Sequence, residues 1–305
     1  MIHLFALLSL LLCGVCYTGF QNSSHFHNTS NRRSLLLLVF GGALLLRLLL
    51  AYTTHGFSND IACFAAWADR IFTLGPGQFY SAEMFTDYPP GFMYVLYLIG
   101  ALRSLLQIPY YSDLHILLLK SPAILCDIAC GFLLYREAVK RLHFSDLQGI
   151  FAASAYLFQP AVILNSSCWG QVDSVYTLMI ILMCLFLMKG NLLPAYAVYG
   201  LGVLLKPQML IFTPVLLAGI WDHVFLQDFS WRKFFYNLCG GLVVICGMLL
   251  LCAPFGLTAA ISQYTSTLGS YEYAAINAYN FWGLLGMNWV DQNTIFLFLP
   301  CKTWG

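Results

Sequence analysis

Charged residues are scarce in this chain: they make up 9% of its 305 residues, where a soluble domain carries roughly 25%. Hydrophobic residues make up 60% of the chain. This composition excludes an ordinary soluble domain, and none is visible between the apolar runs. It predicts a polytopic membrane protein that meets the lipid bilayer directly.

Other absences narrow the class further. The net charge is only +1 and no basic cluster suggests a nucleic-acid footprint, which excludes a nucleic-acid partner. No His, Cys and Asp cluster has metal-ligand spacing, so we expect neither a metal nor a cofactor. Cys13 and Cys16 form a C-x-x-C pair inside an apolar run with no second pair, which favours packing over a redox or zinc site.

Long apolar runs are what the sequence has in abundance. A membrane-spanning helix needs about 20 mostly apolar residues, and we expect an all-α membrane bundle of about eight to ten spanning segments. The candidate runs are Ile2–Thr18, Ser34–Tyr52, Gly91–Leu106, His115–Tyr135, Gly149–Leu164, Ser174–Met188, Leu192–Leu205, Met209–Trp221, Phe234–Ala253 and a run that starts at Ile295. Leu192–Trp221 is also readable as one helix broken at Lys206-Pro207, because proline removes a backbone donor.

Domain organisation follows from these runs. Residues 1–33 hold an apolar segment and a polar linker, and residues 34–305 form the membrane domain. The chain stops soon after an apolar run begins at Ile295, and we therefore expect a C-terminally truncated protein.

Basic residues suggest an orientation. Arg32 and Arg33 precede the second run, so the positive-inside rule predicts that the loop 53–90 lies outside the cytoplasm. The cluster of Arg136, Lys140 and Arg141 also favours the cytoplasm, but simple alternation through the two runs between residues 91 and 135 places it outside. The sequence leaves this conflict open.

The loop 53–90 is the longest polar segment between apolar runs, and it carries Asp60, Asp69, Glu83 and Asp87. Apolar residues at helical spacing over 61–74 predict an amphipathic helix on the membrane surface, capped by Asn59 or Asp60. Transfer of a group to a hydroxyl needs a base that accepts its proton, and a membrane-proximal carboxylate such as Asp60 suits this. For Asp69 and Glu83 we expect surface positions.

Four ionisable residues lie inside or at the edge of apolar runs: Arg103, Asp127, Asp173 and Lys206. Such residues cost roughly 2.5–3.5 kcal/mol each on insertion scales and usually serve a function. Either Asp127 or Asp173 could form a structural ion pair with Lys206, and a direct role in substrate binding is the other reading.

The motifs occur in a distinctive order. They are Phe57-Ser58-Asn59-Asp60 with Trp67, Asp87-Tyr88-Pro89-Pro90-Gly91, Lys120-Ser121-Pro122 with Asp127, Trp169-Gly170-Gln171-Val172-Asp173-Ser174, Lys206-Pro207-Gln208, and a late loop from Asn277 to Trp289. Together they resemble the bacterial mannosyltransferase-related integral membrane proteins, which are similar to the GPI mannosyltransferases. More distantly, they are similar to the dolichyl-phosphate-glucose glucosyltransferases.

The resemblance implies a fold of the GT-C glycosyltransferase type, in which the first extracytoplasmic loop holds the catalytic acid. Such enzymes use a polyprenyl-phosphate-linked sugar and invert its anomeric centre. By this resemblance Asp60 is the catalytic base, and Lys206 meets the donor phosphate. The other residues implied in substrate binding are Asn59, Asp87, Tyr88, Trp169, Gln171, Asp173, Gln208 and Trp282, and the residues with a structural or donor-site role are Asp127 and Lys120.

We therefore expect a multi-pass cell-membrane glycosyltransferase that transfers a hexose, with mannose favoured, on the extracytoplasmic side. The acceptor could be a glycan, a lipid or a protein. One alternative is a transporter or flippase that uses Asp127 and Lys206, although no inverted repeat is visible. Another is an inactive, truncated remnant of the enzyme family.

Overall fold

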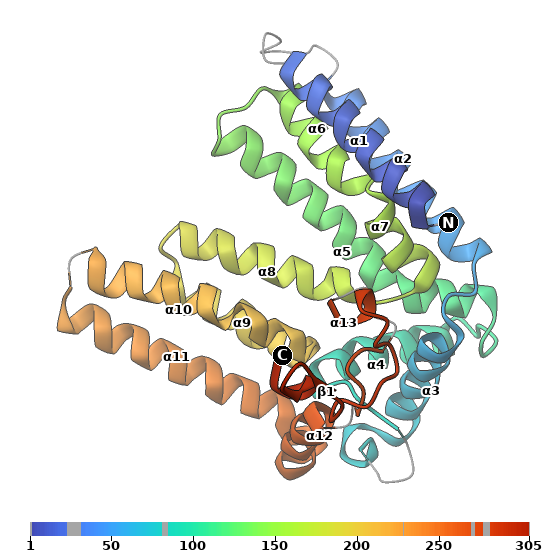
Figure 1. Cartoon of the computed structure of the whole chain (residues 1–305), viewed down its shortest axis with the longest axis vertical. Coiled ribbons are helices and arrows are strands. Elements are labelled where there is room, and N and C mark those ends of the chain that lie inside the picture. Colours follow the sequence, from blue (N-terminus) through green and yellow to red (C-terminus); the bar gives the residue numbers. More distant parts are fainter. Residues whose placement is uncertain are drawn as a thin grey trace. The chain divides into compact units, whose positions relative to one another are not determined.

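The computed structural model of the chain describes residues 2–22, 32–80, 85–227, 229–269, 272–276 and 281–304 (Figure 1). Helices make up 79% of it, which confirms the all-α prediction. The chain divides into two compact units, Met1–Leu257 and Thr258–Gly305, a division that the sequence did not suggest. Glu83 and residues 277–280 of the late loop lie outside the described residues.

Unit 1 is a helical assembly with several breaks. Its α-helices are α1 (Ile2–Asn22), α2 (Arg32–Thr53), α3 (Ser58–Leu74), α4 (Pro90–Leu105), α5 (Asp113–Lys140), α6 (Asp146–Leu157), α7 (Pro160–Ile163), α8 (Asp173–Met188), α9 (Leu192–Leu205), α10 (Thr213–Trp221) and α11 (Trp231–Cys252). The shorter turns are 3₁₀ helices at η2 (Pro76–Gln78), η4 (Pro207–Phe212) and η6 (Ala253–Phe255), and π-helices at η3 (Leu164–Trp169) and η5 (Asp222–Leu226).

Fewer helices than predicted have the length and composition of a membrane span. In the described part of the chain four do: Arg32–Thr53, Asp113–Lys140, Pro207–Leu226 and Trp231–Phe255. A fifth candidate is the pair Asp146–Leu157 and Pro160–Trp169, which is bent by 50°. The remaining apolar helices are shorter; α9, for example, has 14 residues and is about 21 Å long at 1.5 Å per residue, against a hydrocarbon core of about 30 Å.

The predicted break at Lys206-Pro207 is present. α9 ends at Leu205, Lys206 is extended, and the 3₁₀ helix η4 begins at Pro207. Proline has no N–H to continue the helical ladder of α9, and it disfavours a helical conformation at the residue before it. Lys206 is thereby placed at a helix end, outside regular helix.

Antiparallel packing of α2 and α5 places Arg136, Lys140 and Arg141 at the same end of this helix pair as Arg32 and Arg33. Arg47 bonds Asp127, and Lys120 bonds the carbonyl of Ala51, so the C-terminal end of α2 lies beside the N-terminal third of α5. The intervening segment 54–112, with α3 and α4, therefore begins and finishes at one end of this helix pair. Nδ1 of His55 and Oδ1 of Asp113 lie 3.7 Å apart, so the two ends of this segment are close together.

The predicted amphipathic helix is α3, but it packs on the protein. Its apolar face, which includes Ile61, Phe64 and Ala68, is buried against α4 and α5. Fully burying one large apolar side chain contributes about 1.5–3 kcal/mol, and partners on α4 such as Phe92 and Leu96 supply the buried surface. The apolar face of α3 is therefore covered by protein, and its position at the membrane surface stays a prediction.

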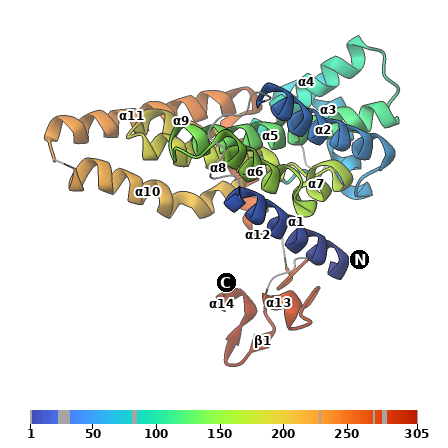
Figure 2. The ribbon, with the colours of Figure 1, turned by 90° about the horizontal axis from the view of Figure 1, so that it is seen from above.

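Two groups of helices meet at α5 (Figure 1). α5 packs against α2 and α6 on one side and against α8 on the other. The second group contains α8 to α11, and α9 lies between α10 and α11 in the view of Figure 2. We call the end of unit 1 that carries α3 and α4 the loop end.

The opposite end of unit 1 is basic, and we call it the basic end. Nε of Arg32 lies 3.2 Å from Oδ1 of Asp146, and this contact joins the N-termini of α2 and α6. Nζ of Lys189 lies 3.6 Å from Oε1 of Glu137, and this contact joins the C-terminal ends of α8 and α5. Eight of the 14 lysines and arginines belong to helix ends on this side: Arg32, Arg33, Arg136, Lys140, Arg141, Lys189, Arg232 and Lys233.

Unit 2 contains α12 (Leu257–Gly269), α13 (Phe281–Leu284), a hairpin of β1 (Ile295–Phe296) and β2 (Leu299–Pro300), and α14 (Cys301–Trp304). The membrane span predicted to start at Ile295 was therefore wrong. Its apolar run is short and ends at Pro300, and Leu297 adopts a left-handed turn with φ of 59° between the two strands. Short apolar runs do not distinguish strand from helix.

Candidate functional site

Asp60 lies in the first turn of α3 at the loop end, and its carboxylate is held by two donors from a distant segment. The indole Nε1 of Trp169 donates to Oδ2 at 2.9 Å, and Nε2 of Gln171 donates to the same oxygen at 2.5 Å. Among the described residues Oδ1 has no hydrogen-bond partner. Asp60 is partly buried and does not cap α3, because the cap position is Phe57, so the predicted cap by Asn59 or Asp60 was wrong.

A sharp turn presents Trp169 and Gln171 to Asp60. The π-helix η3 ends at Trp169, and Gly170 follows with φ of 90° and ψ of 21°, a left-handed conformation that suits glycine. A Cβ on Gly170 would lie 2.6 Å from Cδ1 of Ile61, so a side chain there would force Ile61 to shift. Phe57 N–H donates to the Trp169 carbonyl at 2.9 Å, and the two rings stack with centroids 4.9 Å apart.

An ion pair forms the second half of the site. Lys206, at the break after α9, donates to Oδ1 of Asp173, the first residue of α8. Asn165 donates from Nδ2 to Oδ2 of the same carboxylate at 2.8 Å. Of the two pairings that the sequence left open, the structure contains Asp173 with Lys206. The side chain of Lys206 is 12% exposed and that of Asp173 36% exposed, so the pair is accessible to solvent.

Tyr88 connects the two halves. Its hydroxyl lies within 3.5 Å of Gln171 Oε1, to which it donates, and its ring lies 5.8 Å from the ammonium group of Lys206. Asp87 and Asp60 both lie close enough to Cys63 to affect the pKa of its thiol. Burial raises the pKa of the Cys63 thiol above its ordinary value, and Asp87 and then Asp60 raise this pKa further.

Two predicted residues of unit 1, Asn59 and Gln208, are not part of this cluster, and Trp282 belongs to the other unit. Asn59 and Gln208 are exposed, and they make no hydrogen bond with another described side chain. Trp282 belongs to unit 2, where it is buried beside Ala275 and Cys301, and its ring meets that of Phe296 edge to face at 5.2 Å. Trp282 therefore packs inside its own unit.

Asp127 occupies a different kind of place, fully buried between helices. Arg47 donates to it at 3.1 Å, and the hydroxyls of Ser166, Ser174 and Tyr156 also donate to it at 2.6, 2.5 and 3.3 Å. Arg47 and Asp127 are both 0% exposed. The alternative pairing of Asp127 with Lys206 was therefore wrong. The carboxylate is saturated by donors from α2, α6, η3 and α8, which makes it a structural junction.

Lys120 is also fully buried, and oxygens surround its ammonium group. It donates to the carbonyls of Ala51, Thr54 and Ser167 at 3.3, 2.7 and 2.9 Å, and to the hydroxyl of Thr54 at 3.0 Å. The last carbonyls of a helix have no partner within the helix and favour a cation. Lys120 thus fixes the C-terminal end of α2 to η3, the π-helix that ends at Trp169.

Sequence reasoning missed two residues that matter. Arg47 stands in the run Leu44-Leu45-Leu46-Arg47-Leu48-Leu49-Leu50, where a charge enclosed by leucines is itself a signal of a buried partner. Asn165 has no such signal, because its contact with Asp173 depends on the π-helical turn.

In the described part of the chain no group of three or more His, Cys, Asp or Glu side chains could hold a metal ion. No protein-family model matches the chain, and no curated protein matches it. The class that the fold and composition define is therefore a helical protein whose apolar helices are compatible with a membrane location.

Proposed function

We propose that this chain is a membrane glycosyltransferase of the GT-C type that transfers a hexose from a polyprenyl-phosphate-linked donor to a hydroxyl. One observation carries the proposal: Oδ2 of Asp60 is fixed by Trp169 and Gln171, while Oδ1 has no partner among the described residues. A carboxylate held in this way presents one oxygen to an incoming hydroxyl. General-base catalysis needs this geometry.

The reaction assigns a role to each half of the site. The acceptor hydroxyl oxygen attacks the anomeric carbon while Oδ1 of Asp60 takes its proton. The bond between the anomeric carbon and the phosphate oxygen breaks, and its electron pair leaves with the phosphate. Lys206 then meets the charge that develops on this phosphate, since an ammonium group has three donors and Asp173 occupies only one of them.

The basic end supports an orientation for this proposal. Lysines and arginines favour the cytoplasmic side of a membrane, so the basic end faces the cytoplasm and the loop end with Asp60 faces outward. An epitope inserted after Gly190, at the basic end, should bind antibody only after the cells are permeabilised. Binding on intact cells would reverse the orientation.

Transport was motivated by a joint role of Asp127 and Lys206. In the structure these residues bond different partners, Arg47 and Asp173 respectively. This removes the joint role of Asp127 and Lys206 as a reason for transport. The broken helix at Lys206-Pro207, the other reason, is present, and we prefer catalysis because of the geometry at Asp60.

The test is a transfer assay with membranes that contain the full chain. The membranes receive radiolabelled polyprenyl-phosphate mannose, glucose or galactose, and label that leaves the donor lipid is measured against membranes without the protein. Asp60→Asn removes the base and should lower transfer about 10²-fold or more. Asp113→Asn is the matched control, because this carboxylate also lies at the loop end but only beside exposed His55.

Wild-type activity that is lost in Asp60→Asn and kept in Asp113→Asn supports the proposal. Transfer that survives Asp60→Asn contradicts the role of the base. If the folded wild-type protein transfers none of the three sugars, the inactive-remnant alternative replaces the proposal.

A further inference from the structure

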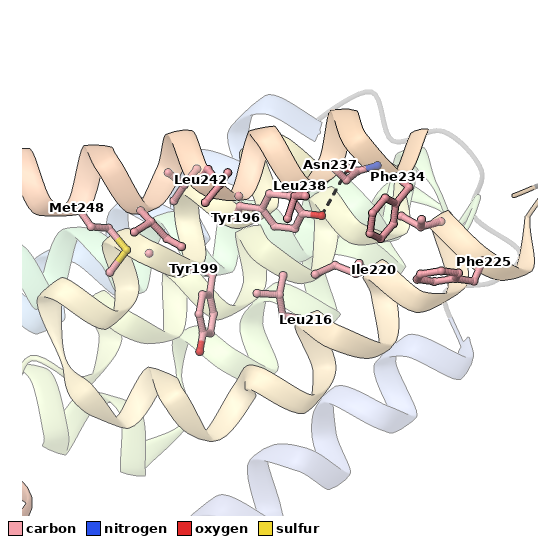
Figure 3. A pocket seen from close by; sticks show the side chains of 15 residues that line it. Tyr196, Tyr199, Leu216, Ile220, Phe225, Phe234, Asn237, Leu238, Leu242 and Met248 are labelled. Carbon is pink, nitrogen blue, oxygen red and sulfur yellow. Dashed lines mark hydrogen bonds between the residues drawn. The ribbon is translucent and has the colours of Figure 1, made fainter. Parts of the chain in front are cut away.

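A long apolar groove lies between α9, α10 and α11, away from the candidate active site. Its volume is about 410 Å³, within the range of roughly 300–1,000 Å³ that ligand sites have. Residues of one face of α11, from Phe234 to Met248, form its wall, with Tyr199 and Leu216 opposite (Figure 3). Over these positions of α11 the groove is about 21 Å long at 1.5 Å per residue.

A second cavity, of about 600 Å³, adjoins the groove at the basic end of unit 1. Asn237 lines both spaces, and its side-chain oxygen accepts a hydrogen bond from Tyr196 at 3.4 Å, the contact drawn in Figure 3. His223, Arg232 and Lys233 line the second cavity, and none of its described lining residues is a carboxylate. The apolar groove thus adjoins a cavity that is lined by His223, Arg232 and Lys233, and we call this cavity the cationic mouth of the groove.

We propose that this groove and its mouth bind an anionic glycerophospholipid. The phosphate lies among Arg232, Lys233 and His223, and one acyl chain lies along α11. Basic pockets between membrane helices on the cytoplasmic side suit anionic headgroups. The groove is longer than one leaflet, which is about 15 Å or half of the hydrocarbon core, so it can hold an extended chain.

A third cavity shows why the cationic mouth matters. It lies between α2 and α5, has a volume of about 510 Å³, and is lined only by apolar residues such as Phe40 and Phe132. Such a surface accepts any acyl chain from the bilayer. The groove on α11 differs because charged residues and Asn237 lie at its end, and these select the headgroup.

The two parts of the site can be altered separately. Arg232→Gln with Lys233→Gln removes the cations at the mouth. Gly241→Leu fills the groove, because Gly241 lines it and a Cβ there meets nothing within 4 Å. Gly247→Leu is the matched control: Gly247 is on the same helix, its Cβ also meets nothing within 4 Å, and it does not line the groove.

The experiment measures retention of phosphatidylglycerol and phosphatidylcholine by the purified full chain, using native mass spectrometry after exchange into detergent with each lipid. The wild type should retain phosphatidylglycerol preferentially. The double glutamine variant should weaken this retention roughly 30-fold, at about fivefold for each charge near the surface. Gly241→Leu should weaken it as well, and Gly247→Leu should not. This readout is independent of glycosyl transfer.

Equal retention of the two lipids by the wild type would overturn the proposal, and the groove would then be ordinary lipid-facing surface. Unchanged retention in the double glutamine variant would overturn the headgroup site. Equal behaviour of Gly241→Leu and Gly247→Leu would overturn the placement of the acyl chain.

Discussion

Asp60 and Asp127 are both carboxylates that accept hydrogen bonds from residues far away in the sequence, yet their surroundings differ. Asp127 is fully buried, and donors from four helical elements saturate both of its oxygens. Asp60 is partly exposed, and among the described residues only its Oδ2 has hydrogen-bond partners. A saturated buried carboxylate holds helices together, whereas a fixed carboxylate with an available oxygen can exchange a proton with a ligand.

Lys120 and Lys206 differ in burial and in the number of their partners, as Asp127 and Asp60 do. Lys120 is fully buried, and backbone and hydroxyl oxygens surround its ammonium group. Within the described part of the chain Lys206 has a single carboxylate partner, and its side chain is partly exposed. The same residue type therefore serves as a helix cap in one region and as a candidate phosphate contact in the other.

The largest expected effect is on stability, from Asp127→Ala. Removing one partner of a buried ion pair leaves the charge of Arg47 uncompensated, which should lower the free energy of unfolding by about 3–5 kcal/mol. Denaturant unfolding in detergent measures this. The double variant Arg47→Met with Asp127→Leu should recover most of the loss, since no charge is left buried. Equal destabilisation by the single and double variants would contradict a structural ion pair.

Lys206→Gln should act on activity. Loss of the cation that meets the leaving phosphate should slow transfer about 10²-fold, with little change in unfolding. Lys189→Gln is the control, because Lys189 pairs with Glu137 at the basic end. If both substitutions changed transfer equally, Lys206 would have no specific place in the site.

Asp69→Asn should have the smallest effect. Asp69 bonds Arg103 between α3 and α4, but its side chain is 41% exposed, and exposed ion pairs contribute about 0.2–1 kcal/mol. Thermal unfolding should shift slightly and transfer should not change. A loss of transfer comparable to that of Asp60→Asn would show that the two carboxylates on α3 act together.

Part of this site could be predicted from the sequence. The family resemblance carried by their motifs predicted that Asp60 shares a site with Trp169, Gln171, Asp173, Tyr88 and Lys206, and the structure brings these side chains together. Periodicity also predicted α3, though not the protein surface that covers it. The periodicity of α3 is a local feature, and Asp173 and Lys206 are residue types that are costly in a membrane, whereas Trp169, Gln171 and Tyr88 followed from the resemblance alone.

The rest depends on contacts that no local pattern encodes. Arg47 and Asp127 are 80 positions apart, and only the antiparallel packing of α2 and α5 joins them. The orientation of Trp169 requires the π-helix and the left-handed Gly170, and neither was visible in the motif. The apolar run at Ile295 was misread because a short run is compatible with both a helix and a strand.

The central claim is that Asp60 serves chemistry while Asp127 serves structure. The most direct test measures both glycosyl transfer and unfolding for Asp60→Asn. Transfer should fall about 10²-fold or more, while the free energy of unfolding stays within about 1 kcal/mol of the wild type. Retained transfer, or destabilisation as large as that of Asp127→Ala, would contradict this claim.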